Sequence, residues 1–313
     1  MSSLVVARPK KKGFSWRRTG FILSFLLIPT IHFVVFYIYV NFNSFAMAFQ
    51  QEINGEIVWG FDNFARFFKE FTLESSEIRL AMTNTAKTFV IQLFLFPVGL
   101  FVSYFLYKKI WGYQIFRILF FLPSVISSVI VCSIYMRFLD VNGFVAKLVQ
   151  NICNLDYTPD VLSETRFANT FVWINMIWLA FPGNMIIWGG TFSRIPDSVL
   201  ESARLDGVNW LQEAFRIIIP VVWPTFALQF LLMFSGFFGA SGNVFLLTQG
   251  GQWGTQTLSN WMYMQVYGAR GGPGDGNVFN YLAAVGMFIT VIAIIVALTI
   301  RKVTGVLFSD VEY

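Results

Sequence analysis

Six long apolar runs constrain the fold of this chain more than any other feature of its sequence. They cover residues 20–40, 88–107, 115–136, 171–192, 221–247 and 281–300. Each run is close in length to the roughly 20 residues that a helix needs to cross a hydrocarbon core of about 30 Å. Backbone groups in lipid find partners only within a helix or a closed barrel, so we expect each run to be helical. The sequence predicts an all-α polytopic membrane protein with about six transmembrane helices, forming a single domain over residues 1–313.

The composition excludes a soluble globular protein. Hydrophobic residues make up 56% of the chain and charged residues only 12%, and a soluble fold could not cover so much apolar surface. The 37 Phe, 11 Tyr and 10 Trp residues suit contact with lipid and its interfaces. The formal net charge of +5 does not indicate nucleic-acid binding, because the basic residues stand at the ends of the apolar runs.

The positions of the charges predict the orientation. Residues 1–19 form a tail with several Lys and Arg residues and no acid. More basic residues follow the second, fourth and sixth runs, whereas acidic residues gather after the first and third. The positive-inside rule therefore places both termini in the cytoplasm, and an even number of spans agrees. The first run is long enough to span and lacks a small-residue cleavage site, so we expect no cleavable signal peptide.

The same rule assigns the connections between the runs. We expect 42–82 to be an external loop that is too short for a conventional soluble domain. Residues 193–220 form a cytoplasmic loop. Residues 250–280 form an external Gly-rich loop that we expect to re-enter the membrane or to cap the external mouth.

Sequence motifs for catalysis, nucleotide binding and metal binding are absent. The chain has no Gly-x-x-x-x-Gly-Lys-Ser/Thr loop for phosphates. Its two cysteines, Cys132 and Cys153, and its single histidine, His32, cannot assemble a metal site or a disulfide framework. The runs contain Asn, Gln, Ser and Thr rather than the carboxylates of ion-coupled carriers, so we expect the energy for any transport to come from another chain. These features predict a protein that is not an enzyme and that holds no cofactor of its own.

The cytoplasmic loop has the pattern of a compact helix-turn-helix. Ser198 and Glu201 have the spacing of a capping box, which would start a short helix. Asp206-Gly207 predicts a turn, since glycine tolerates a positive φ. A second short amphipathic helix is expected from Val208, Leu211, Ala214 and Phe215. Pro220 is expected to mark the beginning of the fifth span. Such a projection is suited to docking in a groove of another protein.

This loop resembles the EAA loop of binding-protein-dependent ABC importer permeases. The resemblance rests on Glu201-Ser202-Ala203, Gly207, Ile217, Ile219 and Pro220, with Ser202 and Ile219 as mild departures. Other segments are similar to sugar permeases of the maltose/glycerol-phosphate type: Phe61-Asp62-Asn63-Phe64, Phe120-Phe121-Leu122-Pro123, Leu205-Asp206-Gly207, Leu247-Thr248-Gln249-Gly250-Gly251, and Thr257-Leu258 with Tyr263. Gln252 stands where that family usually has proline, and the large external insertion of the maltose-type subunit is missing.

The resemblance implies a type I ABC importer permease in a bacterial or archaeal cytoplasmic membrane. It implies a second permease subunit, two ATPase subunits that bind ATP and Mg, and an extracytoplasmic solute-binding protein. The residues expected to couple to the ATPase are Glu201, Ser202, Ala203, Asp206, Gly207 and Pro220. The alternative for Glu201 is a local structural role in the capping box, which would stabilise the helix by about 0.5–2 kcal/mol.

The resemblance also implies a sugar or oligosaccharide as the solute, bound near the middle of the membrane. The candidate pathway residues are Asn175, Asn184, Trp188, Gln229, Asn243, Asn260 and Tyr263. Asn243 and Gln229 are favoured, because related permeases bind sugar chiefly through the second half of the fold. Any of these side chains could instead join helices, at about 0.6–2 kcal/mol each. Two alternatives stay open: a non-sugar solute such as a polyol phosphate or a peptide, and a membrane-embedded enzyme or scaffold.

Overall fold

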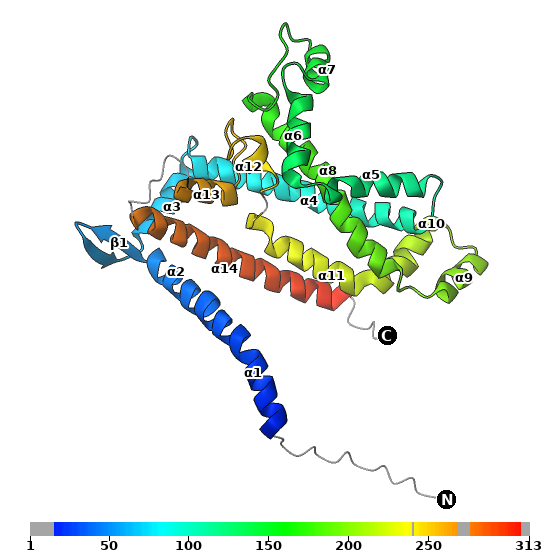
Figure 1. Ribbon diagram of the computed structural model, residues 1–313, viewed down its shortest axis with the longest axis horizontal. Helices are drawn as coiled ribbons and strands as arrows, with labels where there is room; N and C mark the ends of the chain where they lie inside the picture. Colours follow the sequence, from blue (N-terminus) through cyan, green and yellow to red (C-terminus); the bar gives the residue numbers. More distant parts are fainter. Residues whose placement is uncertain (1–15, 240, 268–275, 308–313) are drawn as a thin grey trace, which may run out of the picture.

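A computed structural model describes residues 16–239, 241–267 and 276–307, and in this part of the chain the fold is almost entirely helical. Figure 1 shows long helices running side by side, with short elements gathered at both ends of the bundle. The helix α9 (Asp197–Leu205) and its connection to the next span form one end, which we call the knob end. A β-hairpin and the helices α3 (Asp62–Thr72) and α13 (Leu258–Tyr267) form the opposite end, the far end.

Five continuous helical stretches among the described residues are long and apolar enough to cross a membrane, and a bent pair of helices makes a sixth candidate. The five stretches are Gly20–Ala48, Glu77–Tyr107, Thr165–Phe192, Trp210–Ser235 and Gly276–Thr304. The helices called α4 (Glu77–Tyr107), α8 (Thr165–Phe192) and α14 (Gly276–Leu307) are each unbroken. The prediction of an all-α protein with about six spans is therefore confirmed.

The third apolar run is not one straight helix. It folds into α5 (Tyr113–Val125) and α6 (Ser128–Leu139), which meet at 107°. Ile126 and Ser127 between them have extended backbone, with ψ of 144° and 136°. Pro123 weakens the end of α5, and Val125, Ile126 and the paired serines that follow are poor helix formers. The prediction of a single continuous span over 115–136 was therefore wrong.

The fifth run also differs from its predicted bounds. Its helix begins earlier, with α10 (Trp210–Gln212), and continues through the π-helical segment η2 (Glu213–Ile218) into α11 (Ile219–Ser235). The long helix ends at Gly236, and the rest of the predicted run forms the turn η3 (Phe237–Gly239) and the short helix α12 (Val244–Leu247). Glycine at 236, 239 and 242 disfavours a continuous helix, because each adds backbone freedom without a packing side chain.

The first span stands apart from the others. It consists of α1 (Trp16–His32), the π-helical η1 (Phe33–Tyr39) and α2 (Val40–Ala48). No residue of its most apolar window is buried. Figure 1 shows α1 leaving the bundle while α2 lies along the beginning of α14. The exposed apolar surface of α1 and η1 implies lipid or another subunit around them. Residues 1–15 of the predicted basic tail lie outside the described residues.

Short elements fill the predicted loops. The strands β1 (Gln50–Ile53) and β2 (Glu56–Trp59) pair antiparallel, with Gln50 opposite Trp59. Asn54 and Gly55 join them with φ of 54° and 84°, which is the usual chemistry of a two-residue hairpin turn. Another short helix, α7 (Phe144–Cys153), stands out from the bundle beyond α6. The predicted 250–280 loop contains α13, and its residues 268–275 lie outside the described part of the chain.

Two of the apolar cores among the described residues pack against opposite ends of α4. The knob-end core joins α4, α8, α9 and the fifth span, and its buried residues are Phe96, Leu100, Tyr104, Trp188, Phe192, Ile195, Leu200, Ala214, Ile218 and Val222. The far-end core joins α3, α4, α13 and α14, and its buried residues are Phe67, Ile78, Ala81, Leu258, Trp261, Tyr281, Leu282, Val285 and Ile289. The two ends of α4 are therefore packed in two separate apolar cores.

Candidate functional site

We call residues 197–220, which comprise α9 and the beginning of the fifth span, the knob. The C-terminal end of α9 needs a glycine. The α9 helix closes with a hydrogen bond from the Val208 N–H to the Ala203 carbonyl, at 3.2 Å. Gly207 lies between them with φ of +69°. This five-residue reach across a left-handed glycine is the pattern of a Schellman motif. The predicted turn at Asp206-Gly207 is therefore confirmed, and the glycine is required by the backbone conformation.

The helix cap in the knob lies in a different place from the predicted one. The α9 helix begins at Asp197, so Ser198 is already inside it and cannot be its N-cap. The capping box is formed instead by Asn209 and Gln212: the Gln212 N–H donates to Asn209 Oδ1 at 2.9 Å, and the Asn209 N–H donates to Gln212 Oε1 at 3.1 Å. The predicted Ser198–Glu201 capping box was wrong, because the chain turns into α9 two residues earlier, at Pro196.

The predicted second short helix of the knob is also wrong as a separate element. The chain continues as one helix from Trp210 to Ser235. Pro220 lies within it and does not mark its beginning. Pro220 has no N–H to donate, and the π-helical η2 accommodates that loss by bonding five residues back, as the Ile219 N–H does to the Ala214 carbonyl.

One face of the knob is exposed and the other is packed. Glu201, Ser202 and Asp206 are exposed, whereas Ala203 is buried. Leu205 is 90% exposed, an unusual position for a large apolar side chain at a polar helix end. Leu200, one turn earlier, lies in the knob-end core. The knob thus presents acidic residues and one leucine outward, on a helix that is anchored from behind.

A buried ion pair anchors the knob to α4. The Lys108 ammonium donates to both carboxylate oxygens of Glu213, at 2.6 and 2.8 Å. Glu213 is only 5% exposed. Lys108 follows the last residue of α4, and Glu213 opens η2, so the pair joins the second span to the fifth. The pair could not be predicted from the sequence, because the two residues stand 105 positions apart and nothing in either local pattern points to the other.

A cavity lies at mid-bundle between α4, α8 and α11. It has a volume of about 290 Å³, and three amide side chains line it: Gln92, Asn184 and Gln229. Phe96, Met176 and Leu232 supply much of the apolar wall. Asn184 and Gln229 were predicted from the sequence. Gln92 was missed, although a polar residue inside the second apolar run is a signal that could have found it.

Helices α4 and α8 approach closely beside the cavity, and the amide side chains there make few strong hydrogen bonds. A Cβ at Gly99 would lie 2.9 Å from the Asn184 amide carbon, so this glycine lets α4 approach α8 at the cavity. Asn184 Nδ2 donates to the Ala180 carbonyl at 3.2 Å. Gln92 Nε2 donates to the Met176 sulfur at 3.8 Å, which is a weak acceptor. These amides therefore keep hydrogen-bonding capacity for a ligand.

Two other predicted residues pair with each other. Asn243 Nδ2 donates to Asn175 Oδ1 at 3.1 Å, and Asn175 is completely buried. The Asn175 Nδ2 has no acceptor among the described residues. Asn175 precedes Met176 of the cavity wall, so the pair continues the polar path along α8 toward α12.

The remaining predicted residues lie away from the cavity lining. Trp188 is completely buried in the knob-end core, with its ring 5.8 Å from that of Phe96. Asn260 is buried on α13, where its Nδ2 has no acceptor among the described residues. Tyr263 is 46% exposed and packs edge-to-face on Phe245. Among the described residues, no group of three or more His, Cys, Asp or Glu side chains is placed to hold a metal ion.

Comparison with protein families gives one match over most of the chain. Residues 76–305 match the family described as binding-protein-dependent transport system inner membrane component. The matched region begins beside α4 and contains the knob, the mid-bundle cavity and five of the six candidate spans.

Curated relatives are distant in sequence. A maltose/maltodextrin transport system permease protein of Klebsiella aerogenes is 24% identical over 287 residues, which cover 84% of this chain and 55% of the relative. The corresponding protein of Vibrio vulnificus (strain YJ016) is 26% identical over 61% of this chain and 37% of its own length. An alpha-glucoside transport system permease protein of Rhizobium meliloti is 28% identical over 63% of this chain and 58% of the relative. The chain spans only about a third to three fifths of these relatives.

The fold matches a solved structure more completely. A chain in the crystal structure of a bacterial ABC transporter involved in the import of the acidic polysaccharide alginate superposes with a TM-score of 0.73. The superposition covers 92% of this chain and 96% of that chain, at 23% sequence identity. The arrangement of helices is therefore that of an ABC importer permease.

Proposed function

The chain belongs to the family of binding-protein-dependent transport system inner membrane components, and from that premise we propose that it is the permease subunit of an ATP-driven importer for a sugar or oligosaccharide. The names of its relatives, which concern maltose, maltodextrin and alpha-glucosides, support the solute class. A non-sugar solute, such as a polyol phosphate or a peptide, is the alternative within the same mechanism.

The observation that carries this proposal is the way in which the knob is joined to the cavity. The exposed side of α9 is free to contact an ATPase subunit through Glu201, Ser202 and Asp206, with Leu205 as an apolar anchor. The buried side packs into the knob-end core, which includes Phe96. Phe96 also lines the mid-bundle cavity. A displacement of α9 by an ATPase is therefore transmitted through packed side chains to the cavity wall.

The cavity suits an uncharged, hydroxylated solute. Each of the three amides can both donate and accept, as sugar hydroxyls do. The described lining includes no ionisable side chain, so no charge there needs to be neutralised by a solute. Movement of α11 against α4 and α8 would open the cavity toward one face of the membrane or the other, because Gln229 lies on α11 and its partners lie on the other two helices.

The proposal includes the partners and the location. ATP and Mg would be bound by two partner ATPase subunits, and this chain would hold no cofactor. A second permease subunit would complete the pathway, and the exposed first span offers it a lipid-level surface. An extracytoplasmic binding protein would deliver the solute at the far end. The chain would lie in a bacterial or archaeal cytoplasmic membrane with both termini in the cytoplasm.

Uptake by proteoliposomes tests this proposal. The complex, reconstituted with its partner subunits, is given radiolabelled maltotriose, glycerol 3-phosphate and a tripeptide, with and without internal ATP. We expect ATP-dependent accumulation of maltotriose above the other two. Accumulation of the phosphate or the peptide instead would change the solute class. Uptake that does not depend on ATP would contradict the importer mechanism, and a membrane enzyme or scaffold would give no accumulation.

A further inference from the structure

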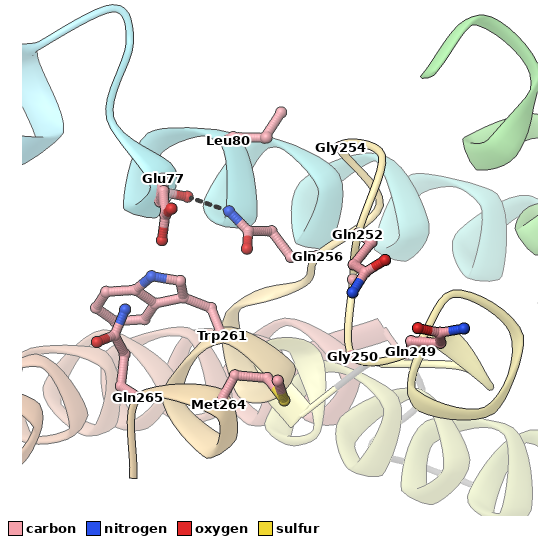
Figure 2. Close-up of a pocket in the computed structure, with 11 residues that line it drawn as sticks. Glu77, Leu80, Gln249, Gly250, Gln252, Gly254, Gln256, Trp261, Met264 and Gln265 are labelled. Atoms are coloured by element: carbon pink, nitrogen blue, oxygen red, sulfur yellow. Dashed lines mark hydrogen bonds between the residues drawn. The ribbon is translucent and has the colours of Figure 1, made fainter. Parts of the chain in front are cut away.

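A second cavity, of about 420 Å³, lies at the far end of the bundle and is distinct from the mid-bundle cavity. It is formed by the beginning of α4, the segment 248–257 and α13 (Figure 2). Its polar lining consists of Glu77, Gln249, Gln252, Gln256, Trp261 and Gln265. None of these six residues lines the mid-bundle cavity.

The lining is unusually rich in amides. Four glutamine side chains and one indole line it, and an amide can donate and accept at once. One of these amides is already engaged, since Gln256 Nε2 donates to the Glu77 carbonyl at 3.3 Å. Figure 2 shows the Trp261 ring rising from α13 toward Glu77 on α4, with the Gln265 amide beside it. Trp261 is only 4% exposed, and its Nε1 has no acceptor among the described residues. An aromatic body with convergent uncharged polar groups is typical of a small-molecule site that accepts hydroxylated ligands.

The segment that carries three of the glutamines is held firmly in place. Asn84 Nδ2 on α4 donates to the Gly254 carbonyl at 2.7 Å and to the Gln256 carbonyl at 3.0 Å. Asn169 Nδ2 on α8 donates to the same Gly254 carbonyl at 2.9 Å. Fixed backbone of this kind reduces the ordering cost of binding a ligand.

The backbone of this segment is also strained. Gln249 and Trp253 have φ of 50° and 53°, in the left-handed region that residues with side chains seldom adopt. Gly251 has φ of +98°, and a Cβ there would lie 2.4 Å from the Cβ of Gln256. Such strain persists only where the surrounding structure imposes it, and it gathers at ligand-binding sites.

A neighbouring cavity extends the site. It has a volume of about 360 Å³ and shares Glu77, Trp261 and Gln265 with the first. Its opposite wall is a linked polar group: the Tyr281 hydroxyl donates to Glu70 Oε2 at 2.6 Å, and Arg66 Nε donates to Glu70 Oε1 at 2.8 Å. Together the two cavities could hold a ligand longer than one ring.

We infer that these paired cavities are a receiving site for an uncharged saccharide of at least two glycosyl units, separate from the mid-bundle cavity. This inference rests on the proposed sugar import. The glutamine amides bind the hydroxyls, and the Trp261 indole lies between the two cavities and contacts both units. The far end is the end at which a solute from outside would arrive, so the saccharide is held here before it passes to Gln92, Asn184 and Gln229.

Protection of an introduced cysteine tests this inference. The full transporter in proteoliposomes carries Cys132→Ala and Cys153→Ser, with Met264→Cys as a reporter in the cavity lining, because Met264 is not one of the amides that would bind the hydroxyls. Asn142→Cys, on the exposed connection between α6 and α7, is the matched control. A membrane-impermeant maleimide labels both, with and without maltotriose or a trimer of uronic acid. At ten times its dissociation constant, maltotriose should slow labelling of the reporter about tenfold and leave the control unchanged.

Two further variants locate the protection. In the reporter background, Gln256→Ala with Gln265→Ala should abolish it, whereas Gln229→Ala should leave it intact. Loss of protection in Gln229→Ala would overturn the inference, because the mid-bundle cavity would then be the cause. Stronger protection by the acidic trimer, or equal protection of the control, would also overturn it. If maltotriose is imported without protecting the reporter, the receiving site is wrong and the importer stands; if it is neither imported nor protective, both proposals fail.

Discussion

The two ends of the bundle are held together by different physical means. The knob end is packed with aromatic and aliphatic side chains, and a buried ion pair there joins the end of α4 to η2. The far end also has an apolar core, but its connecting segments are fixed by amide side chains that bond backbone carbonyls, as Asn84 and Asn169 do at Gly254. Close packing transmits displacement, whereas fixed polar backbone presents binding groups. From this difference we expect the knob end to move during transport and the far end to bind the arriving solute.

The largest expected effect comes from the knob-end ion pair. Lys108→Ala would leave the carboxylate of Glu213 buried without a partner, at a cost of about 3–5 kcal/mol. Glu213→Ala should cost less, because Lys108 keeps 22% of its side-chain surface exposed and can be hydrated. Thermal unfolding of the purified chain in detergent measures both. A paired Lys108→Met and Glu213→Leu variant should recover most of the loss.

Equal destabilisation by the two single variants would contradict this account of the ion pair. Failure of the paired variant to recover would do so as well. Either result would mean that the contact depends on shape at this position and not on the balance of charge.

A smaller effect is expected at the far end from Asn84→Ala. The variant removes two of the hydrogen bonds that hold the segment 248–257 to α4, and it leaves the Gly254 and Gln256 carbonyls with fewer donors, whereas the bond from Gln256 Nε2 to the Glu77 carbonyl remains. Each lost buried bond costs about 1–3 kcal/mol. Hydrogen exchange should rise within 248–257 and stay unchanged in 197–220. The control is Thr83→Ala, whose hydroxyl bonds only the Arg79 carbonyl of its own helix. Increased exchange in the knob would show that the two ends are not independent.

A still smaller loss of stability is expected from Asn209→Ala. This variant removes the capping box at the beginning of α10, which is worth about 0.5–2 kcal/mol. The reference variant is Ser198→Ala, which should change stability by less, because Ser198 lies inside α9. Denaturation midpoints of the two variants give the order directly. A larger loss of stability in Ser198→Ala than in Asn209→Ala would support a capping box at Ser198 instead.

A fourth prediction concerns transport and not stability. Gln229→Ala removes one amide from the mid-bundle cavity without leaving a fully buried group unpaired, since Gln229 is only partly buried. We expect import to fall at least severalfold while the thermal midpoint stays within about 1 °C of the wild type, because surface-accessible substitutions change stability little. Ser235→Ala, on the same helix and bonded only to the Leu231 carbonyl, serves as control. Equal loss of import in both would argue against a specific role for the amide.

The sequence predicted long helices well, because the membrane imposes a single solution on an apolar run. It predicted the turn at Gly207, since only glycine accepts that conformation readily. It could not predict the bend at Ile126, because the preceding and following helices are both apolar and the break depends on a few weak helix formers. The early start of the fifth span could not be predicted either. Pro220 is a strong signal for a helix boundary, but the π-helical hydrogen bonds of η2 let the helix continue past it.

The candidate site was predicted in part. Asn184 and Gln229 were found because polar residues in apolar runs are conspicuous, and Gln92 could have been found in the same way. Trp188 has a similar local signature, but its ring packs against Phe96 on α4 and Phe226 on α11, and these tertiary contacts place it in a core. The Lys108–Glu213 pair depends entirely on the tertiary fold.

We propose that the knob couples this permease to an ATPase, and co-purification of the two proteins tests this coupling. Affinity-purified wild type, Gly207→Pro and Leu205→Ala are compared for bound ATPase subunit. Proline cannot adopt the φ of +69° at position 207, whereas a Cβ at this position would meet no neighbour, so the variant disrupts the turn and not the packing. The account predicts that Gly207→Pro loses the ATPase while its spans keep their thermal stability, and that Leu205→Ala retains less than the wild type. Equal retention by all three would contradict it.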